Sequence, residues 1–334
     1  MMTSIGDLAM SFSNRLSNAR IRGDLNTLAQ ELTTGRKSDL RSALAGDIGP
    51  VSVLERTLSN LAGYDTAATE AAMFASGAQS ALTHMSAHLE DLSTAAFALD
   101  ASSDTALLRS FGKDASSRFD AIVGALNTSV AGRSVFGGSA TDNPPIAATS
   151  VMLDDLIAAL PATPTAQDVI DTVTDYFGAG GGFETTRYLG SDVPIADFRV
   201  APGESAAFDL DARAASLRHA MGVAAMGALI DRGALSDRPD EQSALVSHIA
   251  EDSLSASGGI TILRADVGTL EHRIETARTR NASERAATNF ALYELVAADP
   301  YDTATDLQAV QTQLETFFSV TARLSQLTLS GYLR

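Results

Sequence analysis

The chain of 334 residues contains no cysteine and no tryptophan. Without cysteine, disulfide bonds and thiolate metal sites are excluded. Lys37 and Lys113 are the only lysines. Long apolar runs are also missing, since no stretch approaches the ~18 consecutive apolar residues that a membrane-spanning helix needs. We therefore expect no insertion into a membrane.

Positive charge is scarce relative to negative charge. The chain has 24 Lys+Arg against 41 Asp+Glu, which gives a formal net charge of −17. Phosphate binding requires clustered cations, so nucleic acid is not an expected partner. Residues 1–12 lack the basic segment and apolar core of a cleaved signal peptide. We expect export, if it occurs, to use another route.

The most informative segment is the last part of the chain, residues 302–334. Large apolar residues recur there with alternating spacings of three and four, a heptad pattern that only Thr321 interrupts with a polar side chain. The seam consists of Leu307, Val310, Leu314, Phe317, Thr321 and Leu324, and Leu327 widens it. The spacing predicts a helix of about 30 residues, about 45 Å long.

This helix needs partners, because burying one large apolar side chain contributes roughly 1.5–3 kcal/mol. Ordering each residue costs about 1.5 kcal/mol, so the seam cannot stabilise itself. The other chain end offers matching seams: Leu25, Leu28 and Leu32 share the spacing, as do Ile5, Leu8 and Phe12 after a phase slip. We predict that both seams form an assembly interface, made of Leu8, Phe12, Leu25, Leu28, Leu32, Leu307, Val310, Leu314, Phe317, Leu324 and Leu327.

The middle of the chain predicts further long helices. Heptad spacing favours a helix over 51–100, a third helix to about residue 131, a return to helix over 212–231 and a long helical region over 241–298. Glycines at 63 and 77, and the pair 258–259, are expected to kink or interrupt these helices.

Residues 133–211 differ from their surroundings. Between 139 and 211 there are 12 Asp+Glu and 2 Arg, and prolines at 161, 164, 194 and 202 accompany a glycine-rich run at 178–182. Short stretches at 198–200 and 206–210 resemble strands. We predict a separate, acidic, solvent-facing α+β insert that is dispensable for folding.

The expected fold class is mainly α: an elongated antiparallel helical bundle or coiled coil of N- and C-terminal segments with an inserted small α+β domain. Three regions follow from this reading. They are a terminal assembly region of 1–40 with 300–334, a helical rod of 41–132 with 212–299, and the variable insert 133–211.

Candidate chemistry is sparse. His84 and His88 lie one helical turn apart, but the glutamate of a His-Glu-x-x-His metal motif is absent. No Gly-Lys-Ser/Thr follows the glycine run, so a phosphate loop is not indicated. We predict neither a catalytic site nor a cofactor.

Three stretches resemble the flagellin family, and within it the junction proteins between hook and filament. Leu32-Thr-Thr-Gly-Arg-Lys37 is similar to the end of the family's first helix. The run from Val135 to Ile146 (Val-Phe-Gly-Gly-Ser-Ala-Thr-Asp-Asn-Pro-Pro-Ile) is similar to the family's exit into its variable domain. Val267-Gly-x-Leu-Glu-x-Arg-Ile274, followed by Asp299-Pro-Tyr-Asp, resembles its C-terminal half. Ala45-Gly-Asp-Ile-Gly49 departs from filament flagellins and favours a junction protein.

The resemblance implies a structural, non-enzymatic subunit of the bacterial flagellum that joins hook to filament. It implies export without a cleaved leader, an extracellular location, and self-assembly into a ring. The implied partners are other copies, a neighbouring hook-associated protein, flagellin and an export chaperone. A filament flagellin and an unrelated cytoplasmic coiled-coil scaffold remain as alternatives.

Overall fold

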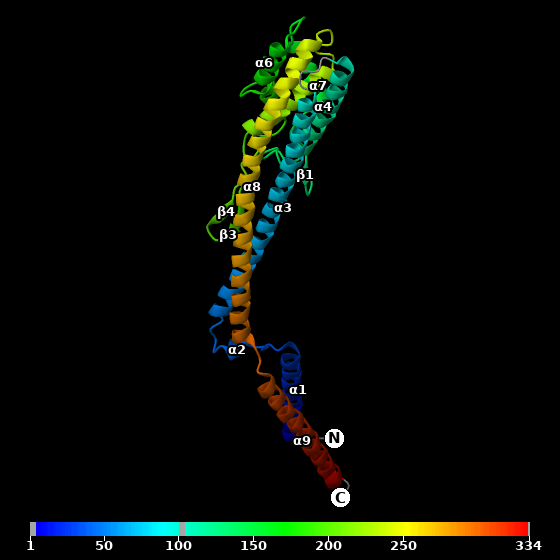
Figure 1. Cartoon of the computed structure of the whole chain (residues 1–334). Coiled ribbons are helices and arrows are strands. Elements are labelled where there is room, and N and C mark those ends of the chain that lie inside the picture. Colours follow the sequence, from blue (N-terminus) through cyan, green and yellow to red (C-terminus); the bar gives the residue numbers. More distant parts are fainter. Residues whose placement is uncertain (1–4, 100–103, 333–334) are drawn as a thin grey trace. The chain divides into compact units, whose positions relative to one another are not determined.

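The protein is mainly α-helical, as the periodicity predicts (Figure 1). The computed structural model describes residues 5–99 and 104–332, with side chains described over 8–99 and 104–323. The chain forms two compact units, Met1–Leu61 with Ala282–Arg334, and Ala62–Asn281. We call these the terminal unit and the central unit. The predicted insert, 133–211, falls inside the central unit.

The terminal unit is built only from helices. It contains α1 (Ile5–Thr34), the single turn α2 (Leu40–Ala43), the start of α3 (Gly49–Ala98), the end of α8 (Pro239–Val296) and α9 (Pro300–Tyr332). Gly35 ends α1 with a φ of +67°, a left-handed conformation that glycine adopts without strain. The predicted stop of the first helix is therefore confirmed.

The central unit contains the rest of α3 and α8 with the elements between them. Four helices lie along the chain there: α4 (Thr105–Leu126), α5 (Thr149–Ala159), α6 (Ala166–Phe177) and α7 (Ala215–Asp231). A π-helical turn, η1 (Phe183–Arg187), follows α6. Two small antiparallel hairpins complete the unit: β1 (Ser129–Val130) with β2 (Arg133–Ser134), and β3 (Phe198–Ala201) with β4 (Glu204–Ala206).

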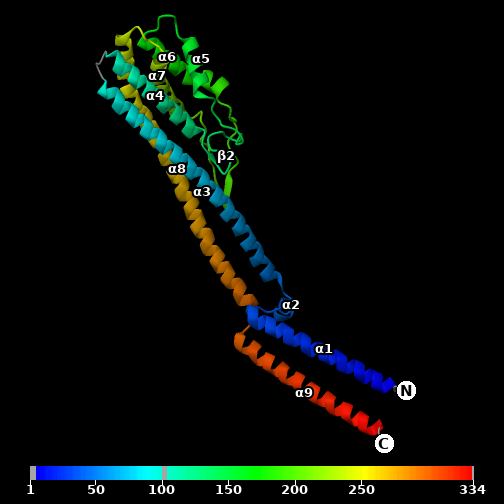
Figure 2. The ribbon, with the colours of Figure 1, turned by 90° about the vertical axis from the view of Figure 1, so that its right-hand side faces the viewer.

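Within the central unit, α3 and α8 run side by side in opposite directions (Figures 1 and 2). Two buried polar contacts fix their register. The hydroxyls of Ser86 and Ser257 lie 3.2 Å apart, and Ser93 donates to the carbonyl oxygen of Ala250 at 2.9 Å. In the central unit the predicted seam of α3 is buried at Ala78, Leu82, Met85, Leu89, Leu92 and Ala96, and its last member, Leu99, is half-buried.

The glycines do not break the long helices, contrary to the sequence-based expectation. Helix α8 continues through residues 258–259, and α3 continues through 63 and 77. At Gly77 the missing side chain has a packing role: a Cβ there would lie 2.5 Å from a methyl carbon of Val130. Glycine thus lets the β1–β2 hairpin approach α3 closely.

The third helix ends earlier than predicted, at Leu126 rather than near residue 131. The side chain of Asn127 binds the backbone of Ile146 through both its amide nitrogen and its oxygen. Ala131 and Gly132 then both adopt positive φ, as the two-residue turn of a tight hairpin requires. The local turn residues, rather than the helical spacing, therefore determine where α4 ends.

The insert shares the hydrophobic core of the helices that flank it. Phe198 and Phe208 lie beside Phe74 of α3, with ring centroids 5.7 and 6.3 Å apart. Buried residues of α5, α6 and β3 belong to one cluster with those of α3, α4 and α7. This packing argues against a dispensable insert, because removing it would uncover that part of the core.

Replacing Phe74 by alanine tests this shared core. Phe74 is 3% exposed, so we expect Phe74→Ala to lower the free energy of unfolding by ~3–5 kcal/mol. Met73, its 43% exposed neighbour, supplies a matched control whose replacement should cost less than ~0.5 kcal/mol. Denaturant titrations followed by circular dichroism measure both. Equal effects would show that the insert does not share the core.

Candidate assembly surface

Helices α1 and α9 form an antiparallel pair in the terminal unit (Figure 2). An isolated bridge between Arg36 and Ala297 fixes their relative register. The amide of Lys37 donates to the carbonyl of Val296 at 2.9 Å, and that of Ala298 donates to Gly35 at 3.0 Å. These bonds tie the end of α1 to the start of α9.

Side chains cap the same junction. The carboxylate of Asp299 accepts hydrogen bonds from the amides of Tyr301 and Asp302, at 2.8 and 3.1 Å. Pro300 occupies the first helical position, where its missing N–H leaves no donor unpaired. Glu31 accepts from the amide of Ser38 at 2.7 Å. The Asp299-Pro-Tyr-Asp motif therefore acts as a helix start that positions α9.

The C-terminal seam forms the face of α9 that packs on α1. The residues at its heptad positions are all half-buried, while most of their neighbours are exposed. They are Leu307, Val310, Leu314, Phe317 and Thr321. Leu324 and Leu327, which the sequence adds to this seam, lie outside the residues whose side chains the structure describes.

Helix α1 carries two apolar stripes rather than one seam. Leu25 and Leu28 are half-buried, and Ile21 is buried, on the face towards α9. We call Ile21, Leu25, Leu28 and the 41% exposed Leu32 the inner stripe. Leu8, Phe12 and Leu16 are 59%, 70% and 64% exposed, and we call them the outer stripe.

The two stripes point in opposite directions and occupy different halves of α1. At 3.6 residues per turn, the outer stripe lies roughly 170° around the helix from the inner one. Asn14 and Asn18 are half-buried where an apolar inner stripe would otherwise continue. The phase slip seen in the sequence is thus a change of face. Leu8 and Phe12 lie on the exposed face of α1, away from the inner stripe, as the phase slip in the spacing indicates.

The register leaves the pair incompletely matched. Counting from the Arg36–Ala297 bridge, Leu25 and Leu28 lie level with Leu307 of α9. Further along, the apolar Leu314 and Phe317 reach the level of the asparagines at 18 and 14. The far part of the α9 seam therefore lies opposite polar side chains of α1 rather than apolar ones.

Exposed apolar side chains gather in the terminal unit. It holds twelve of the 21 exposed large apolar residues among those described, in about a third of the chain. Besides the outer stripe they include Phe290, Tyr293, Tyr301, Phe318 and Val320. By contrast, the hydrophobic core cluster lies wholly in the central unit. Such uneven exposure marks an interaction surface.

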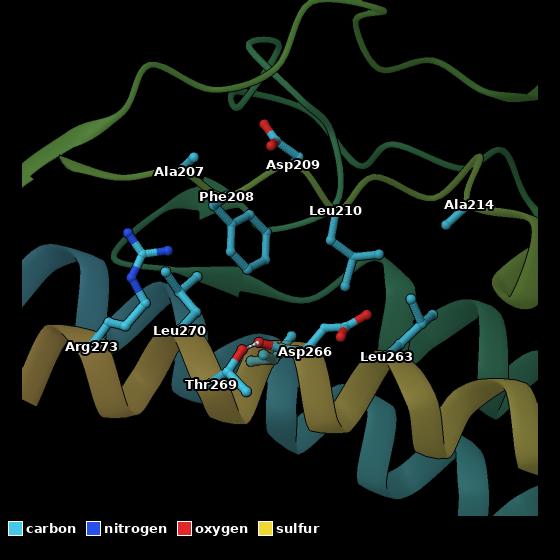
Figure 3. A pocket seen from close by; sticks show the side chains of 11 residues that line it. Ala207, Phe208, Asp209, Leu210, Ala214, Leu263, Asp266, Thr269, Leu270 and Arg273 are labelled. Carbon is cyan, nitrogen blue, oxygen red and sulfur yellow. Dashed lines mark hydrogen bonds between the residues drawn. The ribbon is translucent and has the colours of Figure 1, made fainter.

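A half-open groove of about 400 Å³ lies in the central unit between residues 207–214 and α8 (Figure 3). Phe208 and Leu210 point towards Leu263 and Leu270 on the helix, whereas Asp209 points away. Arg273 stands at one end. Of the basic residues near it, Arg278 pairs with Glu275 and Arg280 with Glu204.

The histidines at 84 and 88 do not assemble a metal site. Burial lowers the pKa of His88 below its ordinary value, and the nearby positive charge of Arg118 lowers it further. Within the described residues, no group of three His, Cys, Asp or Glu side chains is arranged to hold a metal ion. Across that same part of the chain, no helix has the length and apolar character to span a membrane.

Two leucine substitutions separate the roles of the units. Leu314→Asp places a charge on the half-buried α1–α9 seam, so we expect almost no change in the melting temperature of the central unit. Leu89 is fully buried, so Leu89→Asp should lower that melting temperature strongly. Differential scanning calorimetry of the monomer compares them. Equal destabilisation would mean that α9 belongs to the monomer's main core.

Comparison with known proteins agrees with the expected resemblance. The family model for the bacterial flagellin C-terminal helical region matches residues 254–333. None of the curated protein sequences matches the chain.

Two solved structures share the fold. The crystal structure of Bacillus cereus FlgL is similar with a TM-score of 0.51 and 14% identity, covering 71% of this chain and 96% of that one. A protein described as flagellar hook-associated, from Vibrio parahaemolyticus, has a TM-score of 0.50 and 12% identity, covering 73% and 95%. Residues 254–333 are therefore similar to the flagellin C-terminal helical region, and the chain has the fold of the FlgL-type hook-associated proteins, as its motifs predict.

Proposed function

We propose that the chain is a structural subunit of the bacterial flagellum that joins hook to filament and assembles through its N- and C-terminal helices. The observation that carries the proposal is that α1 has apolar stripes on two opposite faces. Its inner stripe is satisfied by α9, whereas the outer stripe has no cover within the described chain. The helix that covers the inner stripe, α9, belongs to the region that matches the flagellin C-terminal helices.

The predicted interface residues divide into two roles. The inner stripe residues Leu25, Leu28 and Leu32, with Leu307, Val310, Leu314 and Phe317, hold α1 and α9 together. Leu8 and Phe12, joined by Leu16, contact a neighbouring subunit. By their spacing, Leu324 and Leu327 continue the α9 seam to meet either α1 or a neighbour.

Self-association explains why the terminal unit leaves so much apolar surface exposed. Burying the outer stripe in a neighbouring subunit would contribute roughly 1.5–3 kcal/mol per large side chain. The proposed partners are other copies in a ring, a neighbouring hook-associated protein and flagellin. An export chaperone covering the same stripes before secretion would prevent early aggregation. The proposed location is outside the cell, reached without a cleaved signal peptide.

A structural role also fits the chemistry better than catalysis does. The groove beside α8 is lined mainly by apolar side chains, and Asp209, one of its few charged residues, points away from it. A filament flagellin is the alternative within the family, but both solved structures with this fold are described as FlgL or hook-associated. If the chain were instead a cytoplasmic coiled-coil scaffold, it would form stable oligomers in dilute solution and would not be secreted.

Complementation tests the proposal. A deletion strain should make hooks without filaments, and the wild-type chain should restore filaments. We expect the outer-stripe variant Leu8→Ser/Phe12→Ser/Leu16→Ser to fail, because it removes the apolar contact. Circular dichroism should show unchanged monomer helicity and melting, since these side chains are exposed.

The other half of the same face of α1 supplies the control. Ala19→Ser/Asn26→Ser/Gln30→Ser changes three positions there that carry small or polar side chains, so it should restore filaments normally. Motility and electron microscopy measure both variants. A functional outer-stripe variant, or long filaments grown from the purified chain alone, would refute the proposed junction role.

A further inference from the structure

A carboxylate shared by two histidines lies between α7 and α8 in the central unit. Nε2 of His219, on α7, lies 2.9 Å from Oδ1 of Asp252 on α8. Nε2 of His248, one turn earlier on α8, lies 4.0 Å from the other oxygen of the same carboxylate. The three side chains line one wall of a cavity of about 460 Å³ that α6 closes on its other side.

The opposite wall of this cavity is uncharged. Helix α6 contributes Ile170, Val173, Thr174 and Phe177. Arg218 is the other charged residue in the lining, and its guanidinium is already engaged. It donates to the carbonyl of Phe177 at 2.7 Å and lies 3.3 Å from Glu184 of η1. Asp252 is therefore the acid that the two imidazoles share, and protonation of His219 creates an ion pair at a half-buried site.

We propose that the His219–Asp252–His248 cluster is a proton-sensitive clamp, which holds α7 and the insert helix α6 more firmly against α8 when His219 is charged. Arg218 links α7 to the end of α6 through the Phe177 carbonyl. Through this link, a firmer contact between α7 and α8 also holds the insert helix α6 in place.

The direction of the pH dependence follows from the two partners. The hydrogen bond with Asp252 raises the pKa of His219 above its ordinary value of 6.5. Its contribution is complete below about pH 6.5 and is lost as pH rises through the raised pKa. The hydrogen bond with His219 lowers the pKa of Asp252 below its ordinary 3.8. That contribution is complete above about pH 4 and is lost at lower pH.

Hydrogen exchange of backbone amides tests the clamp. Protection factors correct for the intrinsic dependence of exchange on pH. For amides of α6 and α7 in the full chain, we expect them to be about two- to five-fold higher at pH 6 than at pH 8. His219→Gln keeps an N–H donor but cannot gain charge, so it should abolish this difference. Asp252→Asn should do the same.

His84→Gln, on an exposed part of α3, is the control and should keep the wild-type difference. Should Asp252→Asn fail to fold, the ring titration of His219 in the wild-type chain, followed by NMR, decides instead. Titration at or below the ordinary imidazole range overturns the clamp. An unchanged pH dependence in His219→Gln overturns it equally.

Discussion

Antiparallel pairing of segments from opposite ends of the sequence is the constraint on which both units depend. A long amphipathic helix cannot cover its own apolar stripe, so α1 needs α9 and α3 needs α8. In the central unit this need is met completely, and buried serines fix the register. In the terminal unit it is met in part, because Asn14 and Asn18 interrupt the inner stripe. That difference separates a self-sufficient core from the surface that we propose for assembly.

Heptad spacing was enough to predict the long helices and the mainly α fold class, but not the short insert helices α5 and α6. The seam of α3 from Ala78 to Ala96 and the α9 seam from Leu307 to Thr321 both lie where the spacing puts them. The predicted interruption at glycines 258 and 259 was wrong, because packing on neighbouring helices holds α8 continuous despite the weak helical preference of glycine.

Long-range contacts were beyond the reach of spacing. The ring contacts of Phe198 and Phe208 with Phe74, one tilted and one edge-on, join residues more than a hundred positions apart, and no local sequence pattern predicts them. The two faces of α1 were visible in principle, since residues 8, 12 and 16 fall on the opposite side of a helical wheel from 21, 25 and 28. The sequence cannot show whether α9 or another copy covers each face. The His219–Asp252 contact was missed because its members stand alone in the sequence.

The antiparallel pairing of α1 with α9 brings the start of one helix and the end of the other to the same end of the pair (Figure 2). Labels fused to either terminus would therefore crowd the same place, beside the outer stripe. A fluorescent or affinity label is better inserted at an exposed turn of the central unit. Gly180 offers such a position, because it has a positive φ and no other atom lies near where its Cβ would be.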